Sequence, residues 1–244
     1  MTRIIILAAG KGTRMNSELP KVLVSLKGRP MIKYLMDSVA AAGIDSRPLI
    51  IVSPENKEII SQELADYNLE YIIQEQQLGT GHAVACARPY LDSTTTNVLV
   101  LYGDHPFLKT ESIKKFSLSA PSALAIMPTT LPDFDDWRQN FYHWGRIIRS
   151  ADGTVEKIVE FKDATDEEKL VTEVNPGFMC FNRSWLLANL DSLHNDNKPQ
   201  EYYLTDLVKI AFESGLSVDS LAIEPHEAMG VNSQAELQIA ESLL

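Results

Sequence analysis

Residues 4–15 read Ile-Ile-Ile-Leu-Ala-Ala-Gly-Lys-Gly-Thr-Arg-Met, and this stretch decides the expected fold. Its apolar first half predicts a buried strand, and its small, cationic second half predicts a loop at the end of that strand. Gly10 and Gly12 can adopt φ > 0 and admit a phosphate group without a Cβ in the way. The stretch therefore predicts a strand that delivers a polyphosphate to backbone amides.

Cationic side chains surround this predicted phosphate site. Lys11 and Arg14 belong to the loop, and Lys21 follows in a Leu-Pro-Lys segment. Their charges fall where a triphosphate would lie. The loop has neither the G-x-x-x-x-G-K-[ST] pattern of a P-loop nor the third glycine of a dinucleotide fold. A tight turn is the alternative interpretation of the two glycines, and the three cations with Thr13 after an apolar strand favour the phosphate site over it.

The composition is that of an ordinary globular enzyme. The 244 residues suffice for one large α/β domain, and 45% are hydrophobic and 23% charged. A net charge of -11 argues against nucleic acid and anionic membranes as partners, because both require a basic face. The first residues predict a core strand instead of a signal peptide, and no apolar stretch approaches a membrane span. Cys86 and Cys180 have apolar neighbours, which predicts buried free thiols and a cytoplasmic location.

Strand-like and helix-like segments alternate in the first half of the chain. This alternation is typical of βαβ units and predicts an α/β fold with a mostly parallel, Rossmann-like sheet flanked by helices. Ligands of such sheets bind beyond the carboxyl ends of the strands. The predicted helices are 31–42 (ended by Gly43), 56–65 and a third from about Thr80, and the predicted strands are 49–52, 69–73 and 98–102.

The second half predicts a small antiparallel lid over the first half. Asp152-Gly153 separates two strand-like segments and is typical of a hairpin turn. No internal repeat or low-complexity linker divides the chain, so we expect one domain over residues 1–244. The predicted strands are 144–149, 155–161, 172–181 and 218–223, the predicted helices are 165–170, 201–215 and 233–244, and a polar loop covers 193–200.

Gln74 and the segment Gln-Leu-Gly-Thr-Gly-His-Ala at 77–83 form a second motif. A glutamine amide offers a donor and an acceptor, which suits the edge of a pyrimidine base. Gly79 lets the backbone approach the face of a base, and Thr80 can cap the helix that follows and contact a ligand. A plain helix entry is the alternative interpretation of these residues.

Tyr102, Gly103 and Asp104 end the predicted strand 98–102. A carboxylate at the end of a buried strand suits a hard divalent cation such as Mg²⁺, which prefers one or two carboxylates with phosphate oxygens and water. A plain turn residue before Pro106 is the alternative for Asp104. The five histidines have no zinc-ligand spacing, and we assign no role to His105.

Later residues offer groups for a polar ligand. Gly145 can present a backbone amide without a side chain, Glu160 a carboxylate and Asn175 an amide. A solvated strand residue would also explain Glu160. Asn232 precedes the last predicted helix, where an asparagine can serve as a helix cap.

Taken in order, these motifs resemble those of the sugar-1-phosphate nucleotidyltransferases, which join a nucleoside triphosphate to a sugar phosphate and release pyrophosphate. The resemblance is greatest to the bacterial UDP-N-acetylglucosamine pyrophosphorylases and extends from Ile4 to Leu237. It rests also on Glu-Val-Asn-x-Gly at 173–177 and Glu-Tyr-Tyr-Leu-Thr-Asp at 201–206. Pro176 stands where the family has threonine, and His105 where the family usually has an apolar residue.

The resemblance implies a residue-by-residue assignment of the site. Mg²⁺ would be the cofactor, and the parts of the domain would be a mainly nucleotide-binding half (1–127), a mainly sugar-binding half (128–232) and a C-terminal helix (233–244). The implied residues are Lys11, Arg14 and Lys21 for catalysis; Leu7, Ala8, Ala9, Gly10, Gly12, Thr13, Gln74, Gly79, Thr80, Tyr102 and Gly103 for the nucleotide; Gly145, Glu160, Asn175, Tyr203 and Thr205 for the sugar; and Asp104 with Asn232 for the metal.

The implied reaction is uridylyl transfer from UTP to a sugar-1-phosphate, N-acetylglucosamine-1-phosphate. We expect a monomer or small homo-oligomer. The bifunctional relatives carry hexapeptide repeats that this sequence lacks, so we expect neither their acetyltransferase activity nor their β-helix trimer. Two alternatives remain: a nucleotidyltransferase for another nucleotide and a sugar phosphate or phospho-alcohol, and a non-catalytic UDP-sugar sensor.

Overall fold

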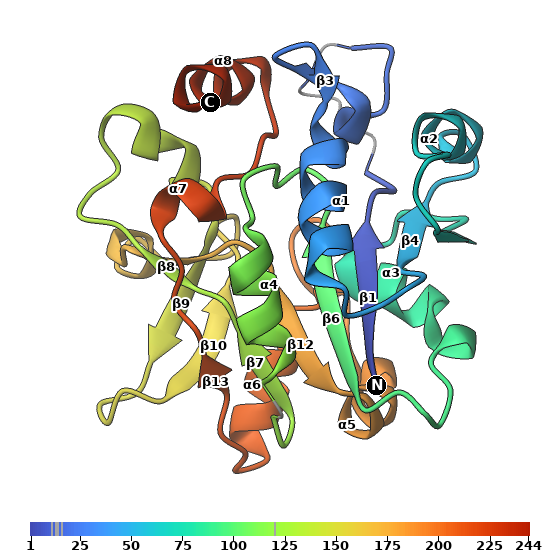
Figure 1. Ribbon diagram of the computed structural model, residues 1–244. Coiled ribbons are helices and arrows are strands. Elements are labelled where there is room, and N and C mark those ends of the chain that lie inside the picture. The colour runs from blue at the N-terminus through green and yellow to red at the C-terminus, as the bar shows by residue number, and fades with distance from the viewer. Residues whose placement is uncertain (11, 13–14, 16, 120) are drawn as a thin grey trace.

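A seven-stranded sheet, in the order β13-β7-β12-β6-β1-β4-β5, forms the centre of the computed structural model, which describes residues 1–10, 12, 15, 17–119 and 121–244 (Figure 1). Among the described residues, each neighbouring pair in this sheet is parallel except the two made by β12. The predicted α/β class with a mostly parallel sheet is therefore confirmed. The strands are β1 (Thr2–Leu7), β2 (Ser25–Leu26), β3 (Arg29–Pro30), β4 (Leu49–Val52), β5 (Glu70–Ile73), β6 (Asn97–Tyr102), β7 (Leu124–Ile126), β8 (Thr129–Thr130), β9 (Gly145–Arg149), β10 (Val155–Val159), β11 (Glu173–Asn175), β12 (Met179–Asn182) and β13 (Asp219–Ser220).

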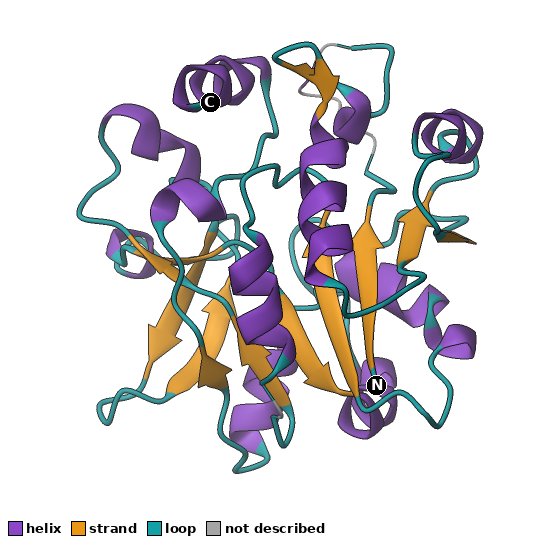
Figure 2. Cartoon of the chain, viewed as in Figure 1, coloured by secondary structure: helices purple, strands orange, loops and turns teal. Residues whose placement is uncertain are grey.

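Helices cover both faces of the sheet, because the central strands are apolar on both faces (Figure 2). In β1, Ile4 and Ile6 face one side, Ile5 faces the other, and all three are fully buried. Helices α1, α2 and α4 pack on the first face, and α3, α5 and α6 on the second. The helices are α1 (Met31–Ala42), α2 (Lys57–Glu63), α3 (Thr80–Cys86), α4 (Thr110–Ser117), α5 (Arg183–Asn189), α6 (Asp206–Glu213), α7 (Pro225–Ala228) and α8 (Gln234–Leu243), with short 3-10 turns at η2 (Lys21–Leu23), η3 (Arg88–Tyr90), η4 (Asp136–Phe141), η5 (Glu168–Leu170) and η6 (Leu190–Ser192).

The second half builds a separate four-stranded antiparallel sheet in the order β10-β9-β11-β8. Its β9–β10 hairpin is the one that Asp152-Gly153 predicted, and Gly153 turns the chain with a φ of 86°. Ile147, Val155 and Ile158 of this sheet share a core with side chains of α6. The small sheet is thereby fixed to the same helix that covers the central sheet.

The predicted strand 172–181 is wrong, because the chain changes sheets in its middle. β11 pairs within the small antiparallel sheet, whereas β12 runs antiparallel between β6 and β7 of the central sheet. Pro176 has no N–H to donate to a ladder, and Gly177 has a φ of 101°. The side chain of Asn175 accepts a hydrogen bond from the Gly177 N–H (3.0 Å) and closes this turn.

Other predicted boundaries are too long. The helix predicted over 201–215 begins at Asp206, because residues 201–205 are bonded to the loop before α3 instead. The strand predicted over 218–223 is only β13, and the helix predicted over 165–170 is only η5. The helix at 31–42 agrees with the prediction at both ends, and Gly43 closes it in the left-handed conformation with a φ of 66°.

The C-terminal helix α8 lies against the segments that follow the first loop. Leu237 and Ala240 share a core with Met15, Val24 and Leu26. Among the described residues, no helix is both long enough and apolar enough to span a membrane. Both cysteines are free, with Cys180 buried and Cys86 half-buried.

We predict that the turn at Gly177 admits no side chain. A Cβ there would lie 2.5 Å from the Tyr102 ring, whereas a Cβ at Gly153 would meet no atom within 4 Å, although both glycines have φ > 0. Gly177→Ala should therefore lower the free energy of unfolding by about 1–3 kcal/mol more than Gly153→Ala, which shares the backbone strain but not the clash. Urea unfolding of the two variants measures the difference, and equal losses would contradict this packing.

Candidate functional site

The site lies where β1 and β6 end side by side. Leu7 at the end of β1 is in register with Tyr102 at the end of β6, and β4 lies on the other side of β1. After β1 the chain first forms β4 on one side of it and later forms β6 on its other side. Such a switch point opens a crevice beyond the carboxyl ends of parallel strands, which is where their ligands bind.

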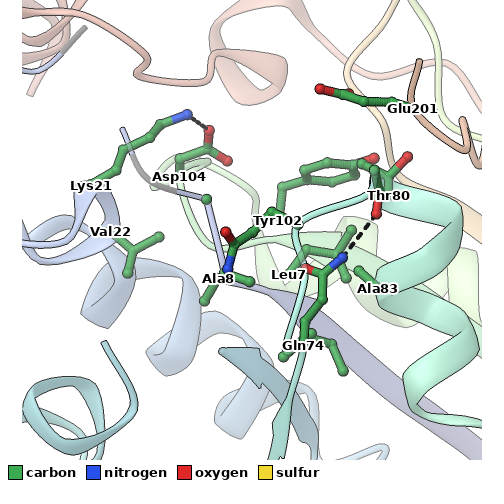
Figure 3. Close-up of a pocket in the computed structure, with 15 residues that line it drawn as sticks. Leu7, Ala8, Lys21, Val22, Gln74, Thr80, Ala83, Tyr102, Asp104 and Glu201 are labelled. Atoms are coloured by element: carbon green, nitrogen blue, oxygen red, sulfur yellow. Dashed lines mark hydrogen bonds and ion pairs between the residues drawn. The ribbon is translucent and has the colours of Figure 1, made fainter. Parts of the chain in front are cut away.

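A cavity of about 320 Å³ opens at this point (Figure 3). Most of the residues predicted to hold the nucleotide line this cavity. Its other lining residues are Val22, Ile51, Gln77, Ala83 and Glu201. Lys11, Thr13 and Arg14 lie outside the described residues. The predicted residues that line this cavity are Leu7, Ala8, Ala9, Gly10, Gln74, Gly79, Thr80 and Tyr102, together with Lys21 and Asp104.

Two of the predicted glycines, Gly10 and Gly103, differ from expectation. Gly10 does not have the positive φ that we predicted, and among the described residues a Cβ there would meet no atom within 4 Å. Gly12 does have a positive φ (60°), but it lies against Lys21, whose Cβ would be 2.4 Å from an added Cβ. Gly103 packs between the side chains of Val22 and Ile32 instead of lining the cavity, and its N–H bonds to the Leu7 carbonyl (3.0 Å). It supports the floor of the site.

A second cavity of about 360 Å³ adjoins the first. The five residues predicted for the sugar and the two predicted for the metal all line it: Gly145, Glu160, Asn175, Tyr203, Thr205, Asp104 and Asn232. The two cavities share Thr80, Tyr102, Asp104 and Glu201. The arrangement is a two-compartment site with Asp104 at the junction.

A cation already lies between the two predicted metal ligands. The ammonium of Lys21 donates to Asp104 Oδ2 (Figure 3) and to Asn232 Oδ1 (2.6 Å). The carboxylate and the amide oxygen come from positions 128 residues apart and converge on one positive charge. Asp104 and Asn232 therefore form a cation-binding pair.

Local structure fixes each member of this triad. Gly12 lets the first loop pack closely on Lys21, because only a residue without a side chain fits there. The backbone N–H of Val231 donates to the Asp104 carbonyl (2.9 Å). Ser233 caps α8, and the carboxylate of Glu236 accepts from the Asn232 N–H (2.5 Å). Asn232 is thus not the helix cap that the sequence left open, because the next residue has that role.

Lys21 and His105 together set the charge of Asp104. Burial by itself opposes ionisation, but the charges of Lys21 and His105 and the hydrogen bonds from both outweigh it, and they hold the pKa of Asp104 well below its usual range. The carboxyl group is therefore ionised throughout the physiological pH range and ready to hold a cation.

Gln74 is buried at the base of the first cavity. Its Nε2 is 3.1 Å from both the Gly79 carbonyl, to which it donates, and His82 Nδ1. Because these contacts use the amide nitrogen, the carbonyl oxygen is the group that Gln74 can offer as an acceptor to a ligand N–H.

The segment 201–205 joins the two compartments. The Gly81 N–H donates to the Tyr202 carbonyl (2.8 Å), and the Tyr202 N–H donates to the Leu78 carbonyl (2.8 Å). A Cβ on Gly79 would lie 2.6 Å from Tyr202 O, so this glycine lets the backbone of segment 201–205 pack closely against it. Thr80 does not cap α3 as we predicted; its hydroxyl accepts from the Leu204 N–H (3.0 Å).

Glu160 is the acidic centre of the second cavity. Its Oε1 accepts a hydrogen bond from the Thr205 hydroxyl (3.0 Å), and a Cβ on Gly145 would lie 3.4 Å from both carboxylate oxygens. Burial raises the pKa of Glu160, the Thr205 hydrogen bond opposes this rise, and the charges of Asp206, Asp163 and Glu201 add to it. An acceptor that has other acids and, among the described residues, no cation beside it suits a ligand that brings hydroxyl or amide donors.

Sequence reasoning missed several residues of the second cavity. His105, Asn140, His143 and Trp144 line it, as does Glu236 of α8. No motif marks Asn140 of η4 or His143, which follows η4; only the tertiary structure brings them to the wall of this cavity. The one available signal was at His105, a polar residue where the resembling family is usually apolar.

Comparison with known proteins places this architecture in a family. The model of the MobA-like NTP transferase domain matches residues 4–203. The chain belongs to this nucleotidyltransferase family. As an NTP transferase domain, it is 40% identical over 241 residues to the bifunctional protein GlmU of Caldicellulosiruptor saccharolyticus, 41% over 243 residues to that of Clostridium botulinum and 40% over 244 residues to that of a Ruegeria species.

These matches cover 98–99% of this chain but 51–52% of each relative. The transferase domain thus spans about half the length of the curated relatives it matches. The predicted membership of the nucleotidyltransferases is confirmed.

We predict that Glu160 destabilises the free transferase domain at neutral and alkaline pH. Its folded-state pKa lies above the ordinary value of 4.5, so the folded protein loses stability as the pH rises through the folded pKa. Glu160→Gln, which still accepts from Thr205, should raise Tm at pH 8, and the gain should shrink as the pH falls toward 4.5. Differential scanning calorimetry at several pH values measures both. Exposed Glu167→Gln is the control, and a pH-independent gain would contradict the assignment.

Proposed function

We propose that this chain transfers the uridylyl group of UTP to a sugar-1-phosphate, N-acetylglucosamine-1-phosphate, and releases pyrophosphate. The observation that carries the proposal is the pair of adjoining cavities with Asp104 at their junction, where the ammonium of Lys21 contacts it. A transferase must hold two substrates at once with their reacting phosphates together. The cavity at the ends of β1 and β6 would take the nucleotide, and the cavity beside Glu160 the sugar phosphate.

In the proposed reaction, a phosphate oxygen of the sugar phosphate attacks the α-phosphorus of UTP. A new P–O bond forms, the bond from the α-phosphorus to the bridging oxygen breaks, and that oxygen leaves on pyrophosphate. The attacking oxygen is already an anion, so no general base is required. Repulsion between the phosphates and their alignment are the main barriers, and positioned cations lower them.

Lys21 is the described residue best placed to stabilise the charge at the α-phosphate. Lys21 and Asp104 both line the first cavity, and the ammonium of Lys21 contacts the Asp104 carboxylate there. The stem of Lys21 packs against Gly12 of the first loop. We assign stabilisation of the leaving pyrophosphate to Lys11 and Arg14 of the same loop.

The residues present fit a magnesium ion. Asp104 and Asn232 offer a carboxylate and an amide oxygen, hard donors that already converge on a positive charge. The described residues contain no group of three or more His, Cys, Asp or Glu side chains that could hold an ion, which suits a metal that takes its remaining ligands from substrate phosphates and water. Asp104 and Asn232 would hold the ion, which when bound supplies charge neutralisation at the phosphates.

Selectivity for uracil is assigned to Gln74. Its amide nitrogen is held by Gly79 and His82, which leaves the carbonyl oxygen to accept from the N3–H of uracil. Cytosine has an acceptor at that position and would face an unpaired oxygen. On the sugar side, Glu160 would accept from ring hydroxyls and Asn175 would donate through its amide.

A substrate panel tests the function. Pyrophosphate release is measured with each of four nucleoside triphosphates and with N-acetylglucosamine-1-phosphate, glucosamine-1-phosphate, glucose-1-phosphate and a phospho-alcohol, with and without EDTA. UTP with N-acetylglucosamine-1-phosphate should give the highest kcat/KM, and EDTA should abolish turnover. Preference for another pair would contradict the proposed substrates, and UDP-sugar binding in a calorimeter without turnover of any pair would make the chain a sensor.

We predict that turnover requires the charge of Lys21. Lys21→Met keeps the stem against Gly12 and removes the ammonium, so kcat should fall by about 10²–10³, the usual cost of one stabilising donor. Lys114→Met, on the exposed side of α4, is the matched control and should keep full activity. Steady-state kinetics at saturating substrates measures the effect, and circular dichroism checks that the variant folds. Turnover near that of the unsubstituted chain would rule out this role.

A further inference from the structure

His105 follows the cation-binding aspartate and has no role in the proposed chemistry. Its side chain is buried, with only 6% of its surface exposed, and its Nδ1 lies 3.1 Å from Asp104 Oδ1. An ionised carboxylate can only accept hydrogen bonds, so Nδ1 must carry the proton of this bond. The bond occupies the oxygen of Asp104 that does not contact Lys21, because the ammonium of Lys21 is bonded to Oδ2.

The other edge of the imidazole faces the segment that carries Asn232. His105 Nε2 is buried and has no hydrogen-bond partner among the described residues, and a Cβ on Gly230 would lie 2.7 Å from it. The ring therefore requires a glycine two residues before Asn232. On the next residue, the Val231 N–H donates to the Asp104 carbonyl, so the imidazole lies beside the contact between these two chain segments.

Three aromatic rings pack against the imidazole. Phe178, Trp144 and Tyr102 meet the imidazole edge to face at centroid distances of 4.9, 5.6 and 5.9 Å. Packing alone would be satisfied by any ring of this size. A phenylalanine in the same place could not make the hydrogen bond to Asp104. This bond therefore distinguishes a positioning role for His105 from packing alone.

We propose that His105 is a positioning residue for the cation pair. Its Nδ1–H holds the Asp104 carboxylate in the rotamer that presents Oδ2 to the cation, and its ring sets the distance to the Gly230–Asn232 segment. Hydrogen bonds to a metal-ligating carboxylate fix its orientation, and their loss typically lowers metal affinity 10–100-fold. The proposal rests on the proposed function, in which this pair holds Mg²⁺.

Two variants separate the hydrogen bond from the packing. His105→Phe keeps a ring against Gly230, Phe178 and Trp144 but has no donor, and His105→Asn keeps an N–H near the position of Nδ1 but loses the ring. The Mg²⁺ concentration for half-maximal turnover should rise about 10-fold or more in His105→Phe, and His105→Asn should recover part of it. The KM for the sugar phosphate should change little. An unchanged Mg²⁺ requirement in His105→Phe, or a rise in His105→Asn as large as in His105→Phe, would overturn the proposal.

A measurement without substrates or metal gives an independent answer. Imidazole ¹⁵N NMR of the free protein should show His105 with a protonated Nδ1, in a signal assigned through the backbone resonances of the unsubstituted chain. An unprotonated Nδ1 would overturn the proposal even if the variants fail to fold. If the unsubstituted chain turns over no substrate pair, the proposed function fails, and the Nδ1 state then decides the bond to Asp104 alone.

Discussion

The ion triad of Lys21, Asp104 and Asn232 is the interaction on which the rest of the site depends. Its members come from the loop after β1, the end of β6 and the residue before the cap of α8, and one positive charge holds them together. Because Asp104 and Lys21 are both partly shielded from water, their attraction is weakly screened, and leaving either unpaired would cost much more than an exposed charge. The triad therefore joins three distant parts of the chain beside the junction of the two cavities.

A second constraint is the way in which the chain crosses between its two sheets. The turn at Pro176 and Gly177 sends β12 into the central sheet, antiparallel beside β6, and leaves β11 in the small sheet. The segment 201–205 makes the complementary link by bonding to the loop before α3. These two backbone connections, more than any side chain, place the wall containing Glu160 opposite the cavity at the ends of β1 and β6.

The sequence predicted most of the fold and much of the site, for identifiable reasons. Strong apolar runs such as β1 and β6 and capped helices such as α1 are specified locally, so their type and position could be read directly. The break at Pro176 could not be placed, because a proline and a glycine in an apolar segment are compatible with a turn or with an edge strand. The late start of α6 was also hidden, since residues 201–205 satisfy their backbone groups through a loop more than 120 residues earlier in the chain.

The sequence by itself determined the chemical inventory: a small, cationic loop after a buried strand, an acid after another, and a glutamine before a glycine-rich helix entry. Tertiary structure alone decided which of these groups meet. Gly103 supports the floor of the site, His105 borders Asp104, and Gly79 lets the backbone of Tyr202 pack closely beside the first cavity. The physical reason is that contact between Asp104, Lys21 and Asn232 depends on the strand order and on the packing of α8. Both are set by burial of the whole core, and not by the residues at or near these three positions in the sequence.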